Sequence, residues 1–124
     1  MLNKEDVAVV RALARRVAEI ANLPFQEEKR RLWRRLNAKN PVRPMVMIDQ
    51  VCWNEMDVGG ALALRCTDPE CRGFEWQLRR TLFQWDNFPV DMVVEPFVRV
   101  GKAIHNTGFG IDTRDETAVT DPTN

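Results

Sequence analysis

The chain reads RPMVMIDQ at residues 43–50 and FPVDMVVEP at residues 88–96, and these stretches contain two apolar runs, Met45–Ile48 and Val90–Val94, separated by an amphipathic stretch. Each run is almost continuously apolar, which is typical of a strand that is buried on both faces. Between them, Asp68-Pro69-Glu70 predicts a helix start, because aspartate caps helices, proline suits the first helical position and an acid there favours the helix dipole. This order predicts a β-α-β unit, from which parallel sheets and barrels are built.

The predicted helix after Asp68 carries one apolar stripe at steps of three and four residues, made by Cys71, Phe74, Leu78, Leu82 and Trp85. Such spacing places the stripe on a single helix face, ready to pack on the sheet. One β-α-β unit cannot cover its own edges, and a complete (β/α)8 barrel needs about 250 residues. We therefore expect an incomplete α/β fold, the first β-α-β unit of a TIM-type barrel.

Two helices are predicted ahead of this unit, which divides the chain into an N-terminal helical segment (1–40) and the start of the barrel (41–124). Asn3 is expected to cap the first helix, whose apolar period runs as far as Asn22-Leu23-Pro24. The second helix is predicted from Phe25 to Asn37.

The second predicted helix carries a basic cluster of Lys29, Arg30, Arg31, Arg34 and Arg35. This cluster either contacts phosphate or an acidic partner, or forms a solvated face paired with Glu27 and Glu28. The second interpretation is favoured, because oppositely charged side chains three or four residues apart on a helix are neighbours.

The composition excludes several classes of protein. Acidic and basic residues balance to a net charge of zero over 124 residues, so nothing points to nucleic acid as a partner. No run approaches the roughly 18 apolar residues that span a membrane, and the N-terminus carries charges within a few residues, unlike a secretory signal. Cys52, Cys66 and Cys71 lack the paired spacing of a disulfide framework or a zinc ribbon. We therefore expect reduced cysteines, a cytoplasmic location and no metal site.

Candidate site residues follow the two predicted strands, because parallel α/β folds bind ligands beyond the carboxyl ends of their strands. Asp49, Gln50 and Trp53 follow the first strand, and Glu95 follows the second. Asp49 and Glu95 are predicted to approach each other as an acid/base or cation-holding pair. The alternative is that both are polar only because the strand leaves the core there.

His105 is the only histidine, and it lies beside Asn106 in the glycine-punctuated stretch AIHNTG at 103–108. Both are candidates for substrate binding, with a hydrogen-bonded loop histidine as the alternative. Cys71 lies near a helix N-terminus, where the pKa of a thiol is lowered. Because Cys71 also falls on the apolar stripe, we predict a buried structural thiol.

Several segments resemble the uroporphyrinogen decarboxylase family. RLWRRLN at 31–37 followed by PVRPMVMI at 41–48 is similar to the approach to its first barrel strand, and residues 88–96 are similar to its second strand. Four segments resemble a methyltransferase-like bacterial and archaeal branch of this family: IDQVCWNEM (48–56), DPECR (68–72), EWQLRRTL (75–82) and IHNTGFG (104–110). The resemblance covers nearly the whole chain but only about the first third of the family's barrel.

The resemblance implies a methyltransferase that moves a methyl group between a small methylated substrate and a corrinoid protein, with zinc bound in the complete enzyme. The decarboxylase has an arginine just after its first strand and an aspartate just past its second. This chain has Gln50-Val51-Cys52-Trp53 and Glu95-Pro96 at those places, which favours methyl transfer. The family's zinc ligands lie on later strands, so the isolated chain is expected to bind no cofactor and to be inactive.

In that interpretation Asp49, Trp53, Glu95 and His105 form one wall of the substrate pocket, and Trp53 offers an apolar or cation–π surface to a methylated ammonium. Two alternatives remain. One is a uroporphyrinogen decarboxylase-type lyase. The other is a non-catalytic truncated or oligomerising α/β module, whose exposed strand edges favour self-association. Neither nucleic acid nor a membrane is expected as a partner, and the sequence does not specify the substrate.

Overall fold

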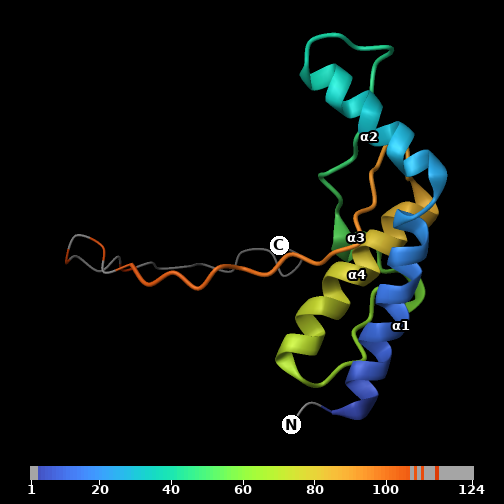
Figure 1. The fold of residues 1–124 in the computed structure, drawn as a ribbon. Helices are drawn as coiled ribbons and strands as arrows, with labels where there is room; N and C mark the ends of the chain where they lie inside the picture. The colour runs from blue at the N-terminus through green and yellow to red at the C-terminus, as the bar shows by residue number, and fades with distance from the viewer. Residues whose placement is uncertain (1–2, 107, 109, 111–113, 115–124) are drawn as a thin grey trace.

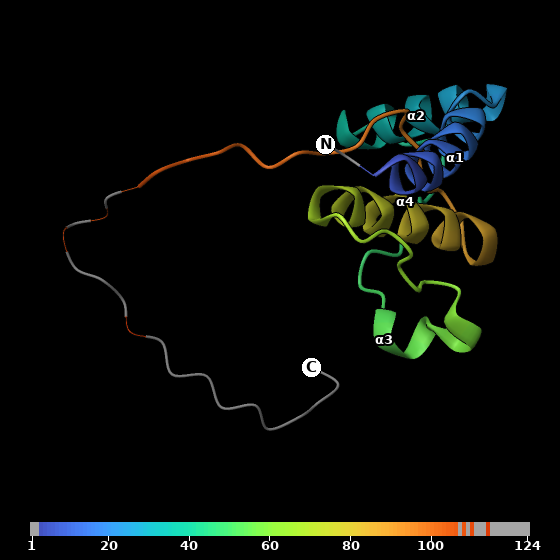
Figure 2. The ribbon, with the colours of Figure 1, turned by 90° about the horizontal axis from the view of Figure 1, so that it is seen from below.

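The structure, a computed structural model, describes residues 3–106, 108, 110 and 114. Within them the chain forms four α-helices and one 3-10 turn: α1 (Lys4–Ala21), α2 (Pro24–Asn37), α3 (Trp53–Met56), the turn Val58–Gly60, and α4 (Pro69–Asn87). α1 and α4 lie side by side, and α2 continues beyond the end of α1 (Figure 1). From below, α4 lies between α1 and α3 (Figure 2).

α1 and α4 begin where the sequence predicts them, because their capping side chains are in place, whereas α2 begins at Pro24 without a side-chain cap. The Asn3 Oδ1 atom accepts a hydrogen bond from the Glu5 backbone N–H at 3.0 Å. The Asp68 Oδ1 atom accepts from the backbone N–H groups of Glu70 and Cys71, each at 3.0 Å. These bonds satisfy N–H groups that have no partner inside the helix. The predicted caps and the helical character of the three segments are confirmed.

The core lies where α1 and α4 face each other. Val17 and Ile20 of α1 pack with Leu78 and Leu82 of α4, and Val94 of the following extended segment joins them. The first four repeat at helical spacing, so each helix turns one apolar face inward. The predicted stripe of α4 is therefore a true core face, but it packs against a helix and not against a sheet.

The predicted strands are the main error of the sequence-based fold. No strand forms among the described residues, and both 43–50 and 88–96 are irregular or extended. The two segments do touch: the Asp91 N–H donates to the Val46 carbonyl at 3.1 Å. The Val46 N–H, however, donates to the Asp91 carboxylate at 2.9 Å, so a side chain takes the place of the ladder partner. The β-α-β unit and the barrel start are accordingly absent from this part of the chain.

A row of side chains on α2 explains why residues 90–94 need no neighbouring strand. Lys29 Nζ donates to the Val90 and Met92 carbonyls at 2.8 and 3.4 Å, and Trp33 Nε1 donates to the Asp91 carbonyl at 2.8 Å. Arg30 and Gln26 bond the Val94 carbonyl and N–H at 3.3 and 3.1 Å. Gln26, Lys29, Arg30 and Trp33, hereafter the α2 polar row, share one helix face. Buried backbone polar groups require partners, and here a helix supplies them.

Two buried carboxylates hold the loop that precedes α4. Asp6 of α1 accepts hydrogen bonds from the Thr67 and Asp68 backbone N–H groups at 3.0 and 2.8 Å. Glu75 of α4, with none of its surface exposed, accepts from the Arg65 and Cys66 backbone N–H groups. These hydrogen bonds hold the loop against α1 and α4.

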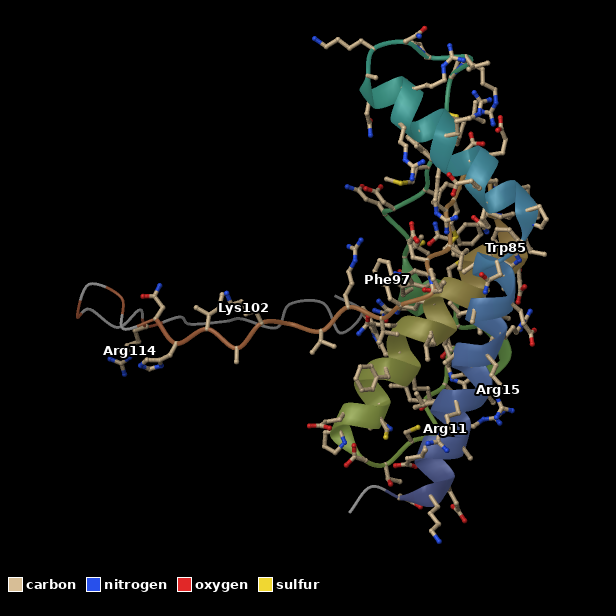
Figure 3. All side chains as sticks on the ribbon, in the orientation of Figure 1. Arg11, Arg15, Trp85, Phe97, Lys102 and Arg114 are labelled. Carbon is tan, nitrogen blue, oxygen red and sulfur yellow. The ribbon has the colours of Figure 1, made fainter. Side chains whose placement is uncertain are left out.

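The chain leaves the helices after Val94 and runs outward as an extended segment. Gln77 of α4 holds its beginning, because the Gln77 amide and the Arg99 backbone exchange two hydrogen bonds at 3.0 and 3.2 Å. Beyond this tether the segment projects away from the helical body, with Lys102 far from it (Figure 3). The range 41–124 expected for the barrel start runs on into 115–124, which lies outside the described residues.

Candidate functional site

A pocket of about 620 Å³ lies between α2 and the extended segments 47–49 and 91–95. Its apolar walls are formed by Trp33, Met47, Ile48 and Met92, and its charged walls include Arg30, Asp49 and Glu95. The volume suits a small molecule, and the lining combines apolar side chains with charged and polar ones. We call this the α2 pocket.

The Glu95 carboxylate in the α2 pocket is neutralised by Arg30. Arg30 Nη2 lies 3.3 Å from Glu95 Oε2, and Nε lies 3.4 Å from Oε1. The bonds to Glu95 raise the pKa of the Arg30 guanidinium, so the cation is retained. Arg34, also at the pocket, pairs with Glu27 at 3.1 Å.

Asp91 is the most firmly held acid of the α2 pocket. The Arg43 guanidinium bonds both of its carboxylate oxygens, at 2.6 and 2.9 Å, and the Val46 N–H adds a third donor. Bonds from Arg43 hold the pKa of Asp91 at about 2. Asp91 is thus a structural carboxylate that joins residues 43–46 to the second extended segment.

Asp49 differs from the other two acids. Its side chain is exposed at the pocket, and no hydrogen bond or ion pair joins its carboxylate to another described residue. The backbone beside it is held, because Gln84 of α4 donates to the Ile48 carbonyl. Asp49 is therefore a carboxylate at the pocket without a cation partner in the described part of the chain.

The structure brings together some of the predicted site residues and separates others. Asp49 and Glu95 line the same pocket, although no sheet edge gathers them there. Gln50 is exposed beside Asp49. His105 and Asn106 are exposed on the projecting segment, where Asn106 Oδ1 accepts from the Gly108 N–H at 2.8 Å.

Trp53 lines a different pocket, between α3 and α4. The Arg80 guanidinium carbon lies 4.8 Å from the centroid of its ring, and Phe83 packs edge-on at 6.2 Å. A cation of the same chain thus already lies over this ring. The aromatic ring that lines the α2 pocket together with Asp49 is Trp33.

Arg30, Trp33 and Met92 line the α2 pocket but were not predicted as site residues. The sequence did carry a signal for Arg30 and Trp33. The hydrogen-bonding side chains Gln26, Lys29, Arg30 and Trp33 recur at steps of three and four residues, which places them together on one face of α2. The basic cluster itself follows the favoured interpretation in part, since Arg31 pairs with Glu28 at 2.6 Å and Arg34 pairs with Glu27.

The described part of the chain does not fit a zinc centre. No three His, Cys, Asp or Glu side chains gather there in a way that would hold a metal ion. Cys66 and Cys71 are buried, as predicted for Cys71, and burial raises the pKa of the Cys66 thiol to about 12.

No model of a known protein family matches this chain, and neither the curated proteins nor the solved structures contain a match. None of the helices in the described residues is long and apolar enough to cross a membrane.

Proposed function

We propose that this chain supplies one wall of the substrate site of a methyltransferase, which exchanges a methyl group between a small methylated substrate and a corrinoid protein. The residues that resemble the methyltransferase-like branch of the uroporphyrinogen decarboxylase family support this class. The proposal does not depend on the barrel that was expected. It rests on one observation: the Asp49 carboxylate has no ion-pair partner among the described residues and lies in a pocket that also has apolar walls.

The charges of the α2 pocket favour a cationic substrate. Glu95 and Asp91 have arginine partners at 3.3 and 2.6 Å, whereas Asp49 has none among the described residues. A carboxylate beside low-dielectric walls attracts a cation more strongly than one in open water. A substrate rich in carboxylates, such as a porphyrinogen, would meet this charge unfavourably, which makes the lyase the weaker alternative.

The apolar walls favour a methylated cation over a bare ammonium ion. Trp33, Met47 and Met92 line the pocket beside the charge. Methyl groups gain by leaving water for such surfaces, and an indole ring attracts a quaternary ammonium through its π face. Asp49 would orient the nitrogen while the apolar walls hold the methyl groups.

Binding of tetramethylammonium to the ¹⁵N-labelled chain, followed by NMR, tests this proposal. The Trp33 indole and Asp49 amide resonances are expected to shift and saturate, and Asp49→Asn should weaken binding about tenfold, since one charge contact is lost. Glu19→Gln, the same carboxylate-to-amide change at an exposed α1 residue outside the pocket lining, is the matched control. Tighter binding of a polycarboxylate porphyrin than of tetramethylammonium would instead favour the lyase.

The corrinoid partner has its own test. Analytical ultracentrifugation of the chain mixed with a corrinoid protein from the same organism should show a complex. If no complex forms while tetramethylammonium still binds at Asp49, the result contradicts the proposed corrinoid partner but not the proposed cation site.

A non-catalytic, self-associating module is the second candidate, and the projecting segment favours it. Phe97, Val100 and Ile104 have 57, 75 and 76% of their surface exposed. Apolar side chains on an extended backbone favour pairing with another chain. Sedimentation equilibrium separates the candidates: a dimer that Val100→Asp converts to a monomer supports the module, and a monomer at all concentrations contradicts it.

A further inference from the structure

The α3–α4 pocket, away from the α2 pocket, contains an arginine whose hydrogen-bonding groups are unused. The Arg80 guanidinium carbon lies 3.7 Å from the centroid of the Trp76 ring and 4.8 Å from that of Trp53. No hydrogen bond or ion pair joins the guanidinium to another described residue. The Arg80 side chain is partly buried, and this burial lowers the pKa of its guanidinium.

The two indole rings hold the guanidinium in one position. Trp76 precedes Arg80 by one helical turn on α4, and Trp53 reaches it from α3. Cation–π contacts with both rings restrict the otherwise flexible side chain. A cation that is already positioned loses less entropy when it binds an anion, so its affinity is higher.

The other charged side chains of this pocket have partners elsewhere and do not pair with Arg80. Arg79, on the same pocket wall, is taken by the buried Glu75 at 2.8 Å. Asp57 also lines the pocket, and its Oδ1 atom accepts from the Leu62 N–H at 2.8 Å. Arg80 is thus the cation without an acidic partner among the described residues of this pocket.

We propose that this pocket binds a small organic monocarboxylate, with its carboxylate on Arg80 and its apolar body on Leu62 and Leu64. The pocket measures about 290 Å³, and both leucines line it. A guanidinium edge matches the two oxygens of a carboxylate. Asp57 disfavours a dianion such as phosphate more than a monoanion, because its repulsion grows with the ligand's charge.

The test follows the four tryptophan indole resonances of the ¹⁵N-labelled chain, with Trp53 and Trp76 assigned from phenylalanine variants. Sodium butyrate is expected to shift both resonances to saturation, whereas sodium chloride at equal ionic strength does not. Arg80→Lys keeps the charge and the stem but loses the fork, so butyrate should bind about tenfold more weakly.

Arg15→Gln is the matched control, because Arg15 is exposed on α1 (Figure 3) and its loss should leave butyrate binding unchanged. Arg80→Lys must retain the native spectrum, which separates lost binding from lost folding. The proposal is overturned if butyrate causes no saturating shift, or if Arg80→Lys binds butyrate equally well. Phosphate that binds as tightly as butyrate would overturn the monocarboxylate class.

Discussion

Glu75→Gln is expected to destabilise the fold strongly, because Glu75 is a fully buried charge with several donors. Its carboxylate accepts from the backbone N–H groups of Arg65 and Cys66 at 2.9 and 2.8 Å, and from Arg79 Nε at 2.8 Å. A glutamine keeps one acceptor oxygen but turns an NH₂ group toward these donors. Removing one partner of a buried ion pair lowers the free energy of unfolding by about 3 to 5 kcal/mol, and we expect a loss of about 3 kcal/mol for Glu75→Gln.

The same substitution should change the pH dependence of stability. Burial by itself would raise the pKa of Glu75, but the donors outweigh it and hold the pKa at about 2, below the ordinary 4.5. A lowered folded-state pKa stabilises the protein above the unfolded value, and this contribution is lost as the pH falls toward 2. The stability difference between wild type and Glu75→Gln should therefore be full at pH 7 and shrink between pH 5 and pH 2.

Urea denaturation followed by far-UV circular dichroism measures both effects. At pH 7 the free energy of unfolding should fall by about 3 kcal/mol, and the melting temperature by about 10 °C for a chain of this size. Glu19→Gln is the control, since Glu19 is an exposed carboxylate on α1. A loss below about 1 kcal/mol, or a difference that stays constant from pH 7 to pH 3, would refute the role assigned to Glu75.

Two further predictions concern the extended segments and the cysteines. Asp91→Asn replaces a carboxylate that accepts hydrogen bonds from Arg43 and from the Val46 N–H. We expect the free energy of unfolding to fall by about 2 kcal/mol and the Val46 N–H to exchange its hydrogen faster. An unchanged exchange rate would contradict the contact. Because its pKa is about 2, the Asp91 contribution should disappear between pH 4 and pH 2. Iodoacetamide at pH 8 should modify the exposed Cys52 first, while Cys66, whose pKa burial raises to about 12, reacts only after unfolding. Mass spectrometry of the labelled peptides reports the order, and equal rates for both thiols would count against the burial of Cys66.

The helices α1, α2 and α4 could be predicted because their signals are local, whereas the short α3 was not predicted. Asn3 and Asp68 cap helices within three residues of their own positions, and the apolar period of α4 is visible in its sequence alone. The strands could not be predicted in the same way. A strand exists only if a second backbone supplies its hydrogen-bond partners, and apolar content does not say which groups will do so.

The candidate site was predicted in part. Asp49 and Glu95 line one pocket, yet the contacts that place Glu95 come from Arg30 on α2, far away in the sequence. Trp53 was expected in that pocket but packs with Arg80 and Phe83, because α3 lies against α4. Which aromatic ring meets which charge depends on how the helices pack, and helix packing is not visible in the spacing of residues along the chain.

The sequence by itself determined the three long helices, the caps of α1 and α4 and the apolar faces of these two helices, because these follow from interactions within four residues along the chain. Only the tertiary structure decided that residues 90–94 bond the α2 polar row, and that Asp6 and Glu75 are buried where a helix pattern alone would expose them. The physical reason is the same in each case. A backbone group or a carboxylate takes whichever partner the packed helices bring within hydrogen-bond distance, and distant parts of the chain supply that partner.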